Sequence, residues 1–98
     1  MPIDMSDNTE YTVLRSGRMV PTSLYRSVRK QVEKRAPELA LGIRYTHRMI
    51  CGEKYWSGLH NQKTAAGLVM ADLVDGQHVP FLFASERDAN PLWYWLKP

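Results

Sequence analysis

The chain has 98 residues, a formal net charge of +3 and a sequence pI of about 9.2, which predicts one mildly basic domain with one modest core. Its hydrophobic fraction of 44% and charged fraction of 23% are those of a globular protein and exclude a disordered chain. The single cysteine, Cys51, excludes an intramolecular disulfide and favours a cytoplasmic setting, and no apolar run approaches the roughly 20 residues of a membrane-spanning helix.

The first residues of the chain are polar and acidic. Residues 1–9 lack the basic and apolar regions of a secretory signal, so we expect a short disordered lead-in before a single domain over residues 10–98. Residues 10–20 mix strand formers with a Ser16-Gly17 turn, which predicts a short strand or a hairpin about that turn. The "RSGR" stretch at 15–18 can bind an anion, but a turn explains it equally well.

Residues 21–39 predict the first helix. Four apolar side chains fall on one helical face: Leu24, Tyr25, Val28 and Val32. Thr22 or Ser23 is expected to cap its start with a hydroxyl. Pro37 lacks the backbone N–H and disfavours a helical residue before it, so the helix should end near Arg35.

The middle of the chain alternates short elements. Residues 41–47 alternate apolar and polar side chains and predict a short strand. Thr46 is then expected to cap a helix over residues 47–59, which Gly52 can break into two pieces.

Residues 61–77 give the clearest helical pattern. Asn61 is the expected cap, and Asp75-Gly76 supplies the stop. The apolar stripe of this helix consists of Leu68, Val69 and Leu73.

The C-terminal residues predict two strands, 79–84 and 92–97, joined by the polar loop 85–91 with its Asn-Pro turn signal. Trp93 and Trp95 share one face of the second strand, and the opposite face carries Leu92, Tyr94 and Leu96.

From residue 21 onward this order of elements resembles a winged helix-turn-helix. The features that carry the resemblance are a helix ending in "LVDGQ", an immediate turn into "HVPFLF" and a C-terminal hairpin with a polar tip. The resemblance implies a small α+β domain of about three helices with a two-stranded antiparallel wing. It lies at the level of the fold, and fold alone does not give function.

Basic residues gather in the first half of the chain. Arg26, Arg29 and Lys30 line one side of the first predicted helix, where they either contact phosphates or form a solvated face. In a winged helix the helix before the wing reads bases, but here its far end carries Asp72 and Asp75, which would repel phosphate. The expected nucleic-acid-binding residues are Arg26, Arg29, Lys30, Gln62, Lys63, Thr64 and Arg87.

The tryptophans near the C-terminus support a second hypothesis. Trp93 and Trp95 either cover a hydrophobic patch of the domain or lie exposed side by side. An exposed pair favours a protein-interaction module, such as a small inhibitor, an adaptor or a homodimer. The first hypothesis, based on the basic residues above, is a regulatory or accessory protein that binds nucleic acid. We expect this nucleic acid to be double-stranded DNA.

The sequence gives no argument for an enzyme, a cofactor, a metal or a small-molecule substrate. His47 and Cys51 are four residues apart, but His60 and His78 lack the spacing of further ligands. No signature of a nucleophile surrounds Cys51, and no glycine-rich phosphate loop is present in the sequence.

Overall fold

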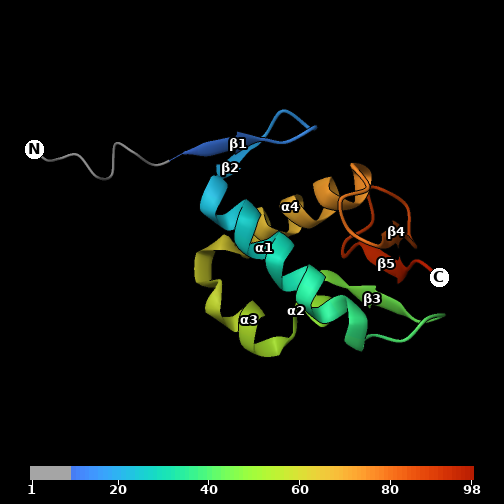
Figure 1. Cartoon of the computed structure of the whole chain (residues 1–98). Coiled ribbons are helices and arrows are strands. Elements are labelled where there is room, and N and C mark those ends of the chain that lie inside the picture. Colours follow the sequence, from blue (N-terminus) through green and yellow to red (C-terminus); the bar gives the residue numbers. More distant parts are fainter. Residues whose placement is uncertain (1–9) are drawn as a thin grey trace, which may run out of the picture.

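A computed structural model describes residues 10–98, so the expected lead-in at 1–9 lies outside the described residues. The elements are β1 (Tyr11–Val13), β2 (Met19–Pro21), α1 (Thr22–Arg35), β3 (Arg44–Thr46), α2 (His47–Cys51), α3 (Glu53–Gly58), α4 (Lys63–Asp75), β4 (Phe81–Phe83) and β5 (Trp93–Leu96). Short 3-10 turns occupy Ala36–Glu38 and His60–Gln62. β1 and β2 form a separate hairpin, whereas β3, β5 and β4 form an antiparallel sheet with β5 in the middle (Figure 1).

The core lies where α1, α4 and the three-stranded sheet meet (Figure 1). α1 contributes Val28 and Val32, and the sheet contributes Phe81 and Tyr94. The buried side of α4 carries Ala66, Val69, Met70, Leu73 and Val74. Of the predicted stripe of α4, Val69 and Leu73 are therefore buried, whereas Leu68 is only partly covered.

The predicted α+β class is confirmed, but the predicted counts of helices and strands differ from the structure. Residues 10–98 contain four α-helices rather than about three, because Gly52 at φ 91° separates α2 from α3. The two predicted C-terminal strands are present as β4 and β5, but they are shorter than the predicted 79–84 and 92–97, and they belong to a three-stranded sheet with β3 rather than to the two-stranded wing that was expected. β3 pairs with β5, with Arg44 opposite Trp95 and Thr46 opposite Trp93.

The start of α1 differs from the prediction, and its end agrees. No side chain caps the helix, whose N-cap is Pro21, because the Thr22 hydroxyl lies 2.8 Å from that of Thr12 on β1 instead. The helix ends at Arg35, as Pro37 predicts. Arg35 donates a hydrogen bond from Nε to the carbonyl of Ile50, at 2.9 Å, and so joins α1 to α2.

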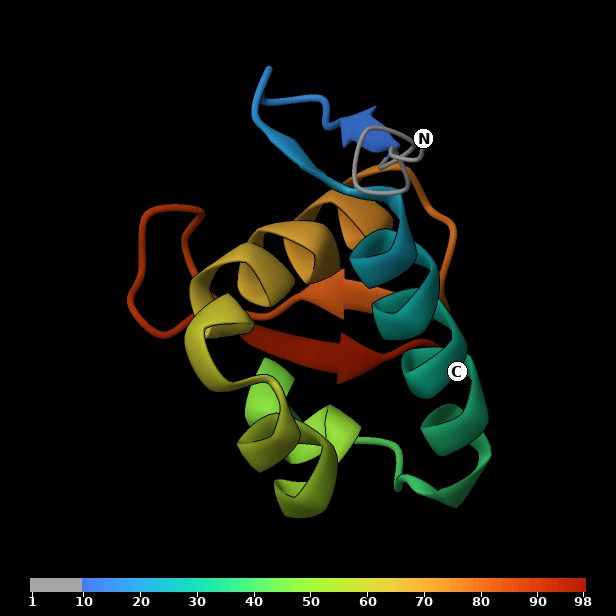
Figure 2. The same cartoon turned by 90° about the vertical axis from the view of Figure 1, so that its left-hand side faces the viewer.

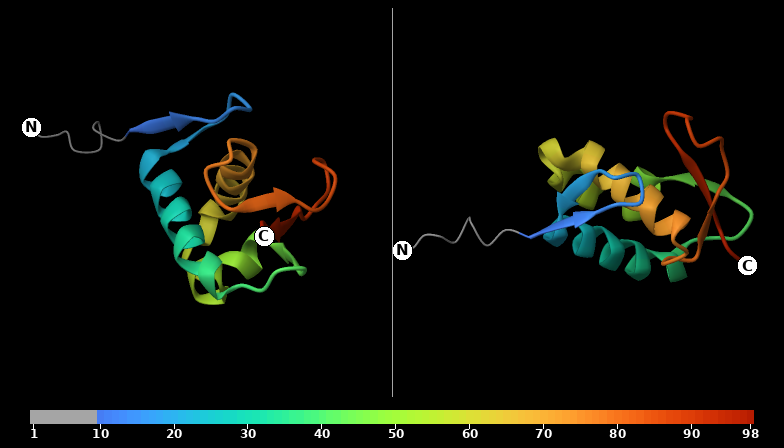
Figure 3. Two further views of the ribbon diagram at one scale, coloured as in Figure 1. Left: turned by 45° about the vertical axis from the view of Figure 1, so that its right-hand side comes forward. Right: turned by 90° about the horizontal axis from the view of Figure 1, so that it is seen from above.

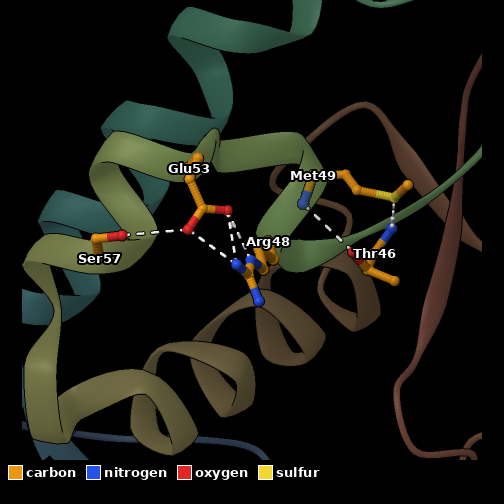
Figure 4. Close-up of polar contacts among 5 residues, drawn as sticks. All are labelled: Thr46, Arg48, Met49, Glu53 and Ser57. Carbon is orange, nitrogen blue, oxygen red and sulfur yellow. Dashed lines mark hydrogen bonds and ion pairs between the residues drawn. The ribbon is translucent and has the colours of Figure 1, made fainter.

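The junction of α2 and α3 follows the predicted cap and break (Figure 4). Thr46 Oγ1 accepts a hydrogen bond from the backbone N–H of Met49 at 3.3 Å. Arg48 donates to both carboxylate oxygens of Glu53, at 2.8 and 2.9 Å, across the break at Gly52. These bonds lower the pKa of Glu53. Trp56 of α3 lies beside Lys63 at the start of α4.

The start of α4 was predicted wrongly. The residue before the helix is Gln62, not Asn61, and it makes no side-chain cap, because His60–Gln62 form a 3-10 turn that leads into Lys63. The predicted stop at Asp75-Gly76 is confirmed. The predicted strand 41–47 is shorter than expected: it begins at Arg44, and the residues before it are exposed.

Candidate functional site

The side of α4 that faces away from the core is small and uncharged over most of its length. It carries Thr64, Gly67, Leu68 and Ala71. This strip is the floor of a hollow of about 630 Å³ whose walls are Trp56 and residues 89–92 of the β4–β5 loop. A second hollow of about 210 Å³ adjoins it toward the end of α4, and Leu68 and Ala71 line both.

Two loops are attached to the C-terminal half of α4. Asp72 Oδ1 accepts a hydrogen bond from the backbone N–H of Arg15, at the tip of the β1–β2 hairpin, at 2.7 Å. Asp75 forms an ion pair with Arg87 of the β4–β5 loop at 3.3 Å. The Arg87 guanidinium also lies 4.1 Å from the centre of the Phe83 ring. The two aspartates therefore hold loops in place, and the guanidinium of Arg87 offsets the negative charge of Asp75, whereas the partner of Asp72 is a neutral N–H.

The N-terminal turn of α4 has a different character. The helix has no acidic residue in this turn and no side-chain cap. Gln62 and Thr64 are exposed there, and Lys63 Nζ lies 5.8 Å from the centre of the Trp56 ring. Three of the predicted site residues are thus neighbours on one exposed, mildly electropositive turn.

The basic row on α1 does not join this site. Arg26 and Lys30 are exposed, and Arg29 pairs with Glu33 at 3.3 Å. The helix turns Val28 and its other buried residues toward α4, so the basic row faces the opposite way. α1 and the β4–β5 loop lie on opposite sides of α4 (Figures 2 and 3). The predicted residues therefore fall on two surfaces: α1 alone, and α4 with the β4–β5 loop.

Arg15 belongs to the second surface, although the sequence singled out its stretch only as a turn or an anion site. Arg15 and Arg87 line the same hollow over the end of α4. The only local signal was the charge of "RSGR", because nothing in the sequence indicates that residue 15 bonds to residue 72.

The tryptophans divide between the two predicted alternatives. Tyr94 is buried, so its neighbours in the strand point to the outer face of the sheet. Trp93 is half-buried there, with the Arg44 guanidinium 5.2 Å from the centre of its ring. Trp95 is 38% exposed and lies opposite Leu82, which is 47% exposed. They therefore form a partly exposed apolar face, in which Trp95 rather than Trp93 is accessible.

His47 and Cys51 lie close together, and burial keeps both side chains in their uncharged forms at neutral pH. Cys51 Sγ lies 3.8 Å from His47 Nε2. Burial lowers the pKa of His47 to about 4 and raises the pKa of Cys51 to about 12, so at neutral pH the imidazole is uncharged and the thiol protonated. Within residues 10–98, no three His, Cys, Asp or Glu side chains are grouped so as to hold a metal ion.

None of the helices in the described part of the chain is both long and apolar enough to cross a membrane. Comparison of the chain with protein families, with curated proteins and with solved structures gives no match.

Proposed function

We propose that the chain is a winged-helix domain that binds double-stranded DNA through α4 and the β4–β5 loop. α4 runs directly into the β4–β5 hairpin, and the loop of that hairpin lies beside the exposed side of α4. This is the relation of reading helix and wing that the sequence resemblance implies. Many functions share one fold, and the residues on the exposed side of α4 favour DNA over other partners.

The observation that carries the proposal is the distribution of charge along α4. Both acidic side chains lie at the C-terminal end, where the backbone N–H of Arg15 binds Asp72 and the guanidinium of Arg87 binds Asp75. The N-terminal turn is free of acid and carries Lys63 with exposed Gln62 and Thr64. A helix of this kind can bring its N-terminal end to the negatively charged duplex while its acidic end holds the flanking loops.

Each residue of this surface has a suitable ligand in DNA. A Gln amide pairs with the major-groove edge of adenine, a Lys ammonium with that of guanine, and a Thr methyl group with that of thymine. Arg87 and Arg15 line one hollow over the end of α4, and guanidinium groups are suited to bind phosphates.

The proposal is tested by the fluorescence anisotropy of a labelled duplex between about 50 and 200 mM salt. Lys63→Ala with Arg87→Ala removes two positive charges from the proposed surface, and we expect the slope of log affinity against log salt to become shallower by about 0.9 for each phosphate contact that is lost. Arg26→Ala with Lys30→Ala removes the same charge from α1 and is the matched control, for which we expect a smaller change. Absence of binding at low salt, or equal effects of the two double variants, would contradict the proposal.

A second candidate function is docking to a partner protein, and the exposed face of Trp95 and Leu82 favours it. Partly exposed indole rings are common anchors at protein interfaces. Trp95→Lys should abolish such docking without unfolding the domain, whereas Lys63→Ala with Arg87→Ala should not affect it. A Trp95→Lys variant that unfolds, with a far-UV circular dichroism spectrum of a denatured chain, would show that this face is part of the core.

A further inference from the structure

The hollow of about 630 Å³ between α4, Trp56 and residues 89–92 (the α4 hollow) has the size and the lining of a small-molecule site. Pockets that hold small organic ligands are concave, measure roughly 300 to 1,000 Å³ and combine apolar walls with a few polar groups. Trp56, Leu68 and Leu92 are apolar side chains of this lining, and each is only partly covered by the rest of the protein. A ligand in the hollow would bury their remaining surface.

The charges around the α4 hollow favour an anion. Lys63 and Arg48 line it, and none of the carboxylates in the described part of the chain does. Arg48 is already bonded to Glu53, at 2.8 and 2.9 Å, so these two charges offset each other (Figure 4). The ammonium group of Lys63 therefore leaves one net positive charge at this end of the hollow. Asp72 and Asp75 line only the adjoining hollow, toward the other end of α4.

Trp56 lies between the two polar ends of the α4 hollow. Lys63 Nζ is 5.8 Å from the centre of the indole ring, and the ring of His47 meets the same indole edge-on at 5.5 Å. A ligand of one or two fused aromatic rings therefore has the length to reach both the ammonium and the imidazole. Such a ring also packs well against an indole, because aromatic pairs attract each other beyond the area that they bury.

His47 provides the second, independent indication of a ligand. Its side chain lines the hollow and is only 7% exposed, and its Nδ1 is buried without a hydrogen-bond partner. Buried polar atoms are nearly always paired, so an unpaired one beside a hollow calls for a partner from outside. Burial lowers the pKa of His47 to about 4, so the ring is neutral at neutral pH and Nδ1 donates or accepts according to the tautomer. A hydroxyl group can pair with either form.

We propose that the α4 hollow binds a small aromatic carboxylate that also carries a hydroxyl group. The carboxylate binds Lys63, the ring packs against Trp56 and Leu68, and the hydroxyl group reaches Nδ1 of His47. Trp56 belongs to α3, none of whose residues is fully buried, so its ring can shift to admit the ligand to this atom. A neutral apolar molecule would leave both the ammonium and the imidazole without a partner, so these two groups favour the hydroxylated acid.

This inference goes beyond the proposed DNA binding and does not depend on it, because ligand binding is measured without DNA. The floor of the α4 hollow is the side of α4 that is proposed to face the duplex. If both proposals hold, ligand and duplex compete, and saturating ligand should weaken the binding of the duplex. Ligand binding without this competition would contradict the DNA-binding surface and leave the ligand site supported.

The test is an NMR titration of the ¹⁵N-labelled chain with 6-hydroxy-2-naphthoate, which carries the two polar groups at opposite ends of two fused rings. The usual ligand efficiency at this size predicts a dissociation constant of about 1 mM or tighter. Binding should shift the amide signals of Thr64, Gly67 and Leu68 and the ring nitrogen signals of His47. The ring signals of His78, which is exposed and does not line the hollow, should not move.

Two variants and a neutral ligand test the role of charge. Lys63→Met removes the ammonium group but keeps a long unbranched side chain, and we expect the dissociation constant of the carboxylate to rise about tenfold. Lys54→Met is the matched control, because it removes the same charge from an exposed site on α3 that lines a different hollow. It should leave the affinity unchanged. The neutral 6-hydroxy-2-naphthamide should bind the natural chain more weakly than the carboxylate does, and Lys63→Met should not affect it.

Four results would overturn the proposal. They are an absence of shifts at several times the expected dissociation constant, ring nitrogen signals of His47 that do not move, equal affinity for the carboxylate and the amide, and equal effects of Lys63→Met and Lys54→Met.

Discussion

Acidification to pH 5 should destabilise the protein through one buried imidazole. His47 is only 7% exposed, its Nδ1 is buried without a hydrogen-bond partner, and its ring meets that of Trp56 edge-on at 5.5 Å. Burial lowers the pKa of His47 from 6.5 to about 4. As the pH falls, the unfolded chain takes up this proton near pH 6.5, whereas the folded chain does so only near pH 4. Protonation therefore favours unfolding throughout this interval.

The magnitude follows from linkage. One proton bound only by the unfolded chain changes the free energy of unfolding by about 1.4 kcal/mol per pH unit. Between pH 7 and pH 5 the free energy of unfolding falls by about 2 kcal/mol. This is less than the full slope over two pH units, because the imidazole of the unfolded chain is only partly protonated near its own pKa. Most carboxylates stay ionised at pH 5, so the imidazole dominates this interval.

The assay is urea unfolding followed by circular dichroism at pH 7, 6 and 5. His47→Leu supplies an apolar side chain in the same place, and its free energy of unfolding should vary much less over this range. His60→Gln and His78→Gln, at exposed positions, leave His47 intact and should retain the loss. The reasoning is refuted if His47→Leu loses as much stability as the natural chain, or if the natural chain is equally stable at pH 7 and pH 5.

Three further predictions concern the core and the capping residue. Phe81→Ala should lower the free energy of unfolding by roughly 3 to 5 kcal/mol, because the ring is fully buried. Trp95→Ala, at a partly exposed position, should lower it by less than half as much. Urea titrations of both variants measure the two losses. Thr46→Ala removes the hydroxyl that caps α2 and should cost about 1 kcal/mol, and equal midpoints for Thr46→Ala and Thr46→Ser would contradict the role of the cap. Cys51 should resist maleimide in native buffer and react fully in urea, since burial raises its pKa to about 12; rapid labelling of the native protein would show that α2 opens readily.

The sequence predicted the elements whose signals are local. The spacing of Val28 and Val32 gave α1, Pro37 gave its end, and Gly52 gave the break between α2 and α3. These features depend on neighbouring residues only, and periodicity or backbone conformation reveals them directly.

The features that the sequence did not predict arise from contacts between distant segments. β3 gains its place as a third strand by pairing with β5, half the chain away. Thr22 bonds to Thr12 rather than capping α1, because the hairpin folds back over the start of the helix. The sequence listed the basic row of α1 together with Lys63, but α1 packs against α4 through its buried residues, so the basic row faces away from α4.

The two aspartates on the last turns of α4 determine how far apart the two loops are held. Asp72 and Asp75 are three residues apart, which on an α-helix is a rise of about 4.5 Å on nearly the same side. The distance between the attachment points of the two loops is consequently set by the geometry of one helix and does not depend on the lengths of the loops. Insertions into residues 88–90 should therefore be accommodated as a bulge beyond the attachment point, leaving the arginines of both loops in the same relative position.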